Sequence, residues 1–247
     1  MGGITTELRT GLAFCTRLPV TAPEAANLAK AAWTFPVVGV LIGALGALVY
    51  WLAGGLSLPP FVSATLAVAA TALVTGCLHE DGLADTADGF GGGTTRERKL
   101  EIMRDSRTGA YGVVALIVSF MLRAGAIASL AGPGLAAAAL IAAHAGARAT
   151  LPIFMRAVPN ARDDGLSSGA GTPPAGPASL AALLGLLALM AFLGVGAGLV
   201  AAFLVVMGLI AFARLSMRQI GGQTGDVLGA VEQASEILIL LAAAALL

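Results

Sequence analysis

Charged residues are scarce in this chain, and their scarcity excludes most classes of soluble protein. Asp, Glu, Lys and Arg make up only 11% of its 247 residues, whereas they make up about 25% of a typical soluble domain. Hydrophobic residues reach 57%, and the mean hydropathy is +0.90. The formal net charge is zero, which excludes nucleic-acid binding through a globally basic surface. The composition therefore predicts a protein embedded in a lipid bilayer.

Cysteine is also rare. Cys15 and Cys77 are too few for a disulfide framework, and their spacing matches no zinc or redox motif. The first thirty residues lack a long apolar stretch, and Glu7 and Glu24 lie among their basic residues. Neither a cleaved signal peptide nor a transit peptide is therefore expected.

Long apolar runs, in contrast, are plentiful. A membrane-spanning helix needs about 20 apolar residues. Seven segments come near that length: 33–54, 60–79, 109–131, 133–156, 178–195, 197–214 and 226–247. We therefore predict an all-α fold, a polytopic integral membrane bundle with about seven transmembrane helices, forming a single domain over residues 1–247.

The fifth and sixth segments form one apolar run that is too long for a single span. Its expected turn lies in the glycine-rich residues 194–198. Before the first span, residues 1–30 are expected to lie at the membrane interface, because apolar side chains recur there at helical spacing with the charges off that face. The apolar positions are Ile4, Leu8, Leu12 and Cys15.

The loops alternate in charge. Those at 55–59, 131–134 and 194–198 carry no charged residue, whereas those at 80–108, 157–177 and 215–225 hold nearly all the charge outside the spans. Basic residues also mark the N-terminal segment. The positive-inside rule then predicts a cytoplasmic N-terminus and cytoplasmic charged loops, with the C-terminus outside the cell inner membrane.

The charged loop after the second span begins with a dense acidic stretch. Seven of the fourteen acidic residues lie between positions 80 and 105. If the helix continues beyond His79, one of its faces carries Asp81, Asp85 and Asp88. Carboxylates at this density favour a bound divalent cation, and Mg²⁺ prefers such oxygen ligands. The alternative is a solvated acidic helix end.

Glycine and arginine follow the acidic stretch. Gly89 and residues 91–93 are expected to end the helix and to let the backbone close around a phosphate. Residues 96–107 fit either an interfacial helix with internal ion pairs or a binding role. Arg104 and Arg107 flank Asp105 just before the third span, and arginine binds phosphate through two parallel hydrogen bonds.

Several polar residues lie within or at the ends of later spans. Asp226 begins the last span, where unpaired helix amides attract anions, and Glu232 and Glu236 follow inside it. His144 and Arg148 are four residues apart in the fourth span. Intramembrane charges of this kind usually face a cavity or a partner. The structural alternative is an ion pair between Arg123, in the third span, and Glu232 or Glu236.

Three stretches together resemble a known family. They are residues 79–89 (HEDGLADTADG), 103–112 (MRDSRTGAYG) and 222–230 (GQTGDVLGA), and residues 16–20 (TRLPV) and 35–39 (FPVVG) add an N-terminal match. In this order they resemble the cobalamin synthase family of adenosylcobinamide-GDP ribazoletransferases. The resemblance covers nearly the whole chain and is weakest between 157 and 215.

The resemblance implies a Mg²⁺-dependent transferase of the membrane. Such an enzyme joins α-ribazole, or its 5′-phosphate, to adenosylcobinamide-GDP and releases GMP, which completes the nucleotide loop of coenzyme B12. The expected partners are these two substrates and the lipid bilayer, without nucleic acid. Other enzymes of B12 synthesis and a second copy of the chain stay open as further partners.

The family roles are carried onto matching positions of this sequence. We expect Asp85 and Asp88 to be catalytic, with Asp88 favoured as general base because the last acid of the stripe should be the most exposed. The expected metal ligands are Glu80, Asp81, Asp85 and Asp88. The expected substrate contacts are His79, Arg104, Asp105, Arg107, Arg148, Thr224 and Asp226.

Two other functions were weighed against this one. A CDP-alcohol phosphotransferase also carries aspartates at helical spacing, but the downstream aspartate pair of that pattern is missing here, and Asp85 stands where an Ala-Arg pair would follow the turn. A cation transporter or channel needs acids along a path. The acids of this chain cluster at one face, and its predicted outer loops carry no charge.

Overall fold

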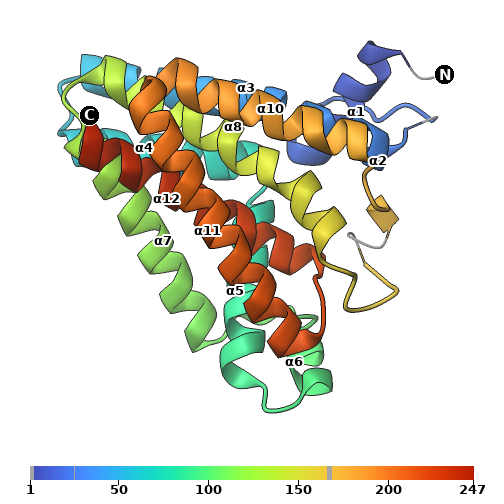
Figure 1. Ribbon diagram of the computed structural model, residues 1–247. Helices are drawn as coiled ribbons and strands as arrows, with labels where there is room; N and C mark the ends of the chain where they lie inside the picture. The colour runs from blue at the N-terminus through green and yellow to red at the C-terminus, as the bar shows by residue number, and fades with distance from the viewer. Residues whose placement is uncertain (1–2, 25, 166–168) are drawn as a thin grey trace.

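The computed structural model describes residues 3–24, 26–165 and 169–247 as a bundle of packed helices (Figure 1). Within these residues, six helices are long and apolar enough to cross a membrane, and a bent pair makes a seventh candidate. The predicted polytopic helical membrane fold is confirmed. The six spans are Leu28–Gly55, which includes α3 (Phe35–Gly55), α7 (Ala110–Ser129), α8 (Pro133–Ala157), α10 (Ala175–Leu193), α11 (Val195–Ile220) and α12 (Gly225–Leu246).

The bent pair consists of α4 (Pro60–Thr75) and α5 (Leu78–Gly92), which meet at 92°. The second span was expected to continue through His79, and this expectation is wrong. Gly76 and Cys77 have φ values of 67° and 55°, a left-handed conformation that ends a helix. A side chain at Gly76 would also collide with Arg17. The acidic stretch therefore lies on a separate helix that leaves α4 nearly at a right angle.

The acidic helix ends within the expected glycines, because α5 ends at Gly92 and Gly93 is its C-cap, although Gly89 itself lies inside the helix. The missing side chains of these glycines also serve packing. Gly89 faces the side chain of Met103, and a Cβ at Gly91 would lie 2.7 Å from the ring of Tyr111. The short helix expected after them is confirmed as α6 (Arg96–Ile102). α5 and α6 lie together at one end of the bundle (Figure 1).

The other predicted boundaries agree with the structure to within a few residues. α10 and α11 separate at Gly194, which has a φ of 78° and lies in the expected turn. α11 runs on to Ile220 rather than ending near 214. The expected N-terminal helix is α1 (Ile4–Cys15), with Cys15 fully buried and Ile4 exposed.

α8 is the central helix of the bundle. In the most apolar 18-residue stretch of α8, 83% of the residues are buried, compared with 17% in that of α11. Small residues allow the close approach of neighbouring helices, as is common between membrane helices. A Cβ at Gly43 of α3 would lie 2.5 Å from the Cα of Ile141 on α8. α7 and α11, in contrast, expose large apolar side chains such as Met121 and Phe203, which suits contact with lipid.

Candidate active site

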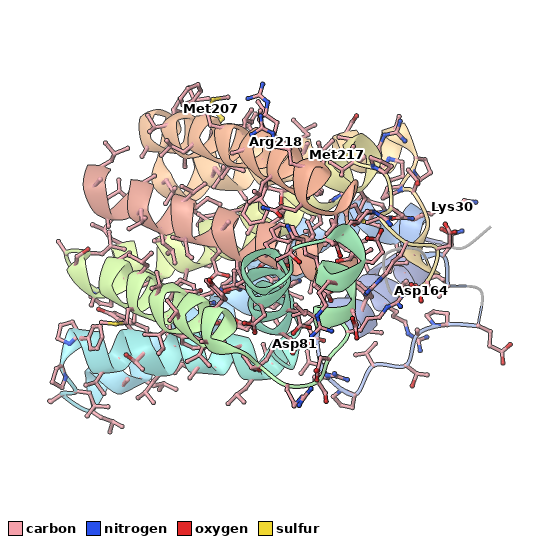
Figure 2. The ribbon with its side chains drawn as sticks, turned by 90° about the horizontal axis from the view of Figure 1, so that it is seen from below. Lys30, Asp81, Asp164, Met207, Met217 and Arg218 are labelled. Carbon is pink, nitrogen blue, oxygen red and sulfur yellow. The ribbon has the colours of Figure 1, made fainter. Side chains whose placement is uncertain are left out.

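α5 and α12 cross in direct contact, and this crossing determines where their acidic side chains lie. Gly82 of α5 faces Gly229 of α12, and a Cβ at Gly82 would lie 2.7 Å from the backbone oxygen of Asp226. The N-terminal turn of α12 is therefore held beside the acidic face of α5. Figure 2 looks onto this end of the molecule, with Asp81 labelled on α5.

Four aspartates lie near the crossing. Asp85 is half-buried, and its carboxyl group interacts electrostatically with the other three and with Arg162. Like charges in one region repel one another, and a cation that prefers carboxylate oxygens, such as Mg²⁺, would offset that repulsion. We call these four residues the acidic cluster: Asp81, Asp85, Asp88 and Asp226.

Asp226 is held in the cluster by its neighbours. Thr224 is the N-cap of α12, where its hydroxyl accepts a hydrogen bond from the Val227 amide at 3.3 Å. The same hydroxyl donates to Oδ2 of Asp226 at 3.1 Å, and Nη2 of Arg162 lies 3.4 Å from that oxygen. Thr224 and Arg162 thus hold Asp226, whose carboxylate acts electrostatically on Asp85.

Asp88 is the least accessible member of the cluster, with 7% exposure. The expectation that it would be the most exposed is wrong. Its two carboxylate oxygens accept hydrogen bonds from the amides of Gly109, at 2.6 Å, and Gly112, at 2.9 Å. These amides begin α7 and have no partner within their own helix. A carboxylate also suits the positive end of a helix dipole, so Asp88 fastens α5 to α7.

Glu80 lies on the other side of α5 from Asp81, since adjacent residues on a helix point in different directions. Its Oε1 is 3.1 Å from Nη1 of Arg123, and Glu80 is 5% exposed. The structure therefore does not bring Glu80 together with the acidic cluster, where it was expected as a metal ligand.

Glu80 belongs instead to a second charged group inside the bundle. Arg148 pairs with Glu232 at 2.7 Å, and His79 lies 3.4 Å from the same carboxylate. The predicted ion pair of Arg123 is present with Glu236, at 3.4 Å. His79 and Arg148, expected to touch substrate, are buried here. We call this group the buried network: His79, Glu80, Arg123, His144, Arg148, Glu232 and Glu236.

Three members of the buried network have donor atoms close enough to hold a metal ion. The ligand atoms of His144, Glu232 and Glu236 all lie within 4.8 Å of one another. However, the Arg148 guanidinium already lies 2.7 Å from Glu232 and 3.0 Å from Nδ1 of His144. Arg123 compensates Glu236 in the same way. Because arginine side chains supply the positive charge, this group is better explained as an internal ion-pair network than as a metal centre.

The remaining predicted substrate contacts lie on the exposed surface. Nη2 of Arg104 donates to both carboxylate oxygens of Asp164, at 2.6 and 2.7 Å. Arg107 and Asp105 pair with each other at 2.7 Å. Hydrogen bonds from Arg107 lower the pKa of Asp105 to about 2. These side chains therefore bind one another or the loop after α8, rather than the acidic cluster.

Arg162 is a residue of the site that the sequence analysis missed. It lies in the loop after α8, and it contacts Asp226 and lies 3.5 Å from Asp164. Asp164 is visible near the edge of the same face in Figure 2. No spacing rule connects position 162 with 226, because they meet only through the packing of two loops. The available signal was the charge of the 157–177 loop.

The family model described as cobalamin-5-phosphate synthase matches residues 7–244. A protein of Bradyrhizobium diazoefficiens named adenosylcobinamide-GDP ribazoletransferase is 55% identical over 97% of this chain and 93% of its own length. Proteins with the same name from Mesorhizobium japonicum and Azorhizobium caulinodans are each 48% identical, over 94% and 96% of this chain and 90% and 95% of their own lengths. No solved structure matches.

The matched region includes every helix that contributes to the acidic cluster and the buried network. Both the family model and these relatives extend over nearly the full chain, so the similarity is not confined to one motif. The chain therefore belongs to the cobalamin-5-phosphate synthase family.

Proposed function

We propose that this protein is an adenosylcobinamide-GDP ribazoletransferase. It joins α-ribazole or α-ribazole 5′-phosphate to adenosylcobinamide-GDP, releases GMP, and yields adenosylcobalamin or its 5′-phosphate. The observation that carries this proposal is the similarity to relatives of that name over 94–97% of the chain. The acidic cluster gives the activity a site, since a reaction at a diphosphate needs hard cations and their oxygen ligands.

Asp81, Asp85 and Asp226 are the proposed ligands of Mg²⁺. They come from α5 and α12, and their carboxylates repel one another without a cation. When bound, Mg²⁺ neutralises charge on the phosphate oxygens of the substrate. Asp88 supports the site by holding α5 against α7. Glu80 is left out of the ligand set because Arg123 pairs with it inside the bundle.

Asp85 is the proposed general base. It takes the proton of the ribazole 3′-hydroxyl as that oxygen attacks the phosphate nearest the cobinamide arm. The bond from this phosphate to the GMP oxygen breaks, and GMP leaves. Asp88 is less suited to this task because the amides of Gly109 and Gly112 occupy both of its oxygens. Positioning and charge neutralisation supply most of the rate in such transfers.

The site is proposed to face the cytoplasm from the cell inner membrane. Three charged loops meet at one end of the bundle. Arg96, the first residue of α6, donates hydrogen bonds to the backbone oxygens of Ile220, at 2.9 Å, and Ala161, at 2.5 Å. Clustered basic residues favour the cytoplasmic side. The N-terminus is then cytoplasmic and the C-terminus outside.

Purified protein tests the activity directly. Incubation with adenosylcobinamide-GDP, α-ribazole and Mg²⁺ should release GMP, and EDTA should stop the release. Glu101→Gln is the matched acidic control, because Glu101 is exposed and pairs with Arg98 on α6, away from the acidic cluster. Unchanged release in EDTA would contradict the metal assignment, and no release under any condition would contradict the reaction.

Cysteine labelling tests the orientation. Cys77 is exposed and is first replaced by Ser, whereas Cys15 is buried. New cysteines at Ser57 and Ser106 should react from opposite sides of the membrane, with Ser106 on the cytoplasmic side. Labelling of both from one side would contradict the proposed number of crossings.

A further inference from the structure

Arg162 differs from the other arginines near the site in how little of its hydrogen-bonding capacity is used. Its Nη2 lies 3.4 Å from Asp226 and its Nε lies 3.5 Å from Asp164. Ion-pair hydrogen bonds are normally about 2.7–2.9 Å long. Its Nη1 is buried and has no hydrogen-bond partner among the residues that the structure describes. A buried donor without a partner is costly, so this guanidinium has an unused hydrogen-bond donor to offer an anionic ligand.

The other arginines near the site are already engaged. Arg104 pairs with Asp164, and Arg107 pairs with Asp105. Arg123 and Arg148 are buried against glutamates of the buried network. Arg162, in contrast, acts electrostatically on Asp85 and contacts Asp226. It is therefore the arginine whose charge is directed at the acidic cluster.

The backbone that carries Arg162 is fixed against the entry to α12. The amide of Ala161 donates to the Gln223 oxygen, and the amide of Gln223 donates to the Pro159 oxygen, both at 2.8 Å. Gly222 makes this approach possible, because a Cβ there would lie 2.8 Å from the Ala161 nitrogen. The Gln223 side chain adds a 2.6 Å hydrogen bond to Asn160. Arg162 thus follows a segment whose position is determined by the same loop that positions Asp226.

We propose that Arg162 binds the diphosphate of the nucleotide-activated substrate, exchanging its long contact with Asp226 for phosphate oxygens. This inference rests on the proposed function, because it takes the acidic cluster as the place where the diphosphate binds. A planar guanidinium matches phosphate oxygens in pairs. In the free protein, Asp226 and Asp164 hold Arg162 beside the site. With substrate bound, Arg162 offsets negative charge that the carboxylates alone would repel.

The first test measures binding without turnover. Calorimetry with GDP and Mg²⁺ as the probe compares wild type, Arg162→Gln, Arg162→Lys and the control Arg98→Gln, whose arginine pairs with Glu101 on the exposed face of α6. Loss of charged hydrogen bonds should weaken GDP binding about ten- to a hundredfold in Arg162→Gln. Arg162→Lys should be intermediate, since it keeps the charge and loses the planar fork. Arg98→Gln should match wild type.

The second test measures turnover with two acceptors. Arg162→Gln should raise KM for adenosylcobinamide-GDP about tenfold or more, to the same degree with α-ribazole and with α-ribazole 5′-phosphate. A loss seen only with the 5′-phosphate would overturn the proposal, because Arg162 would then serve the acceptor. Equal GDP binding by Arg162→Gln and Arg98→Gln would also overturn it.

The two tests separate this inference from the proposed function. If wild type releases no GMP but Arg162→Gln still loses GDP binding, the diphosphate contact stands and the reaction does not. If wild type releases GMP and Arg162→Gln behaves as wild type, the reaction stands and the diphosphate contact is rejected. Elution of each variant as a single species in size-exclusion chromatography checks folding. Should Arg162→Gln fail this check, Arg162→Lys decides by the same two measurements.

Discussion

The acidic cluster and the buried network both use side chains of α5 and α12, but they differ in how far their charges are compensated. The buried network holds three glutamates and two arginines, which pair at 2.7–3.4 Å. The acidic cluster holds four aspartates and one arginine, which makes long contacts. The buried network compensates most of its own charge, whereas the acidic cluster has an excess of three negative charges.

This difference fits a structural role for the buried network and a ligand-binding role for the acidic cluster. Buried charges without partners are strongly destabilising, so a group inside the bundle must contain its own counterions. A group at the mouth of the bundle can leave charge for a ligand to neutralise. The same sequence stretch shows both outcomes, since Glu80 turns inward to Arg123 while Asp81 is exposed. Adjacent acids of one motif therefore have unrelated tasks.

The largest expected effect is the loss of turnover when a carboxylate of the acidic cluster is removed. Asp81→Asn and Asp85→Asn should each lower GMP release about a hundredfold or more, because electrostatic stabilisation dominates phosphoryl transfer. Neither should lower the thermal stability, because no buried pair is broken and repulsion among the carboxylates is relieved. GMP release and thermal unfolding are measured on the same preparations. Normal activity in both variants would show that the excess negative charge does not hold the metal.

The opposite result is expected when the buried network is broken. Arg123→Met removes the arginine that pairs with Glu80 and Glu236 and should lower the free energy of unfolding by about 3–5 kcal/mol. Arg98→Met is the control, since it removes an exposed ion pair worth at most about 1 kcal/mol. Unfolding in detergent measures both. If the two variants lose equal stability, the buried network does not hold the bundle together.

Much of this organisation could be predicted from the sequence. Hydrophobic length predicted the spans, because a bilayer requires about 20 apolar residues whatever the tertiary contacts are. Helical spacing put Asp81 and Asp85 on one face of α5. The bend between α4 and α5 was missed because it depends on Cys77, a non-glycine residue with positive φ, and local sequence gives weak warning of such a residue.

Long-range contacts account for the other errors. Asp88 looked exposed at the end of an acidic stripe, yet its exposure is decided by the amides of Gly109 and Gly112 on another helix. Arg148 was expected to contact substrate, yet its guanidinium pairs with Glu232. Arg162 was overlooked because its loop reaches the site only by pairing with residues near Gln223. The sequence shows which residues are charged, but it does not show with which residues they pair.

A smaller effect is expected from separating the two helices at their crossing. Gly82→Ala would place a methyl group 2.7 Å from the Asp226 backbone oxygen, and such overpacking costs about 1–3 kcal/mol. The shift should move Asp226 away from Asp85 and lower GMP release. Gly125→Ala on α7 is the control, because a Cβ there meets nothing within 4 Å. Equal activity in both variants would mean that the close crossing does not position the acidic cluster.

The smallest effect is expected for the exposed pair of Asp105 and Arg107, which belongs to neither group. Hydrogen bonds from Arg107 lower the pKa of Asp105 from its ordinary value of 3.8 to about 2. A lowered pKa in the folded state means that the pair stabilises the protein above pH 4 and loses that contribution as the pH falls toward 2. Because both side chains are exposed, solvent and salt screen the interaction. The melting temperature of Asp105→Asn should therefore lie slightly below that of wild type at pH 7, and the gap should shrink by pH 3 and in high salt. A large gap at pH 7 that persists in high salt would mean that Asp105 has a further partner, and that this surface pair has more in common with the buried network than its exposure indicates.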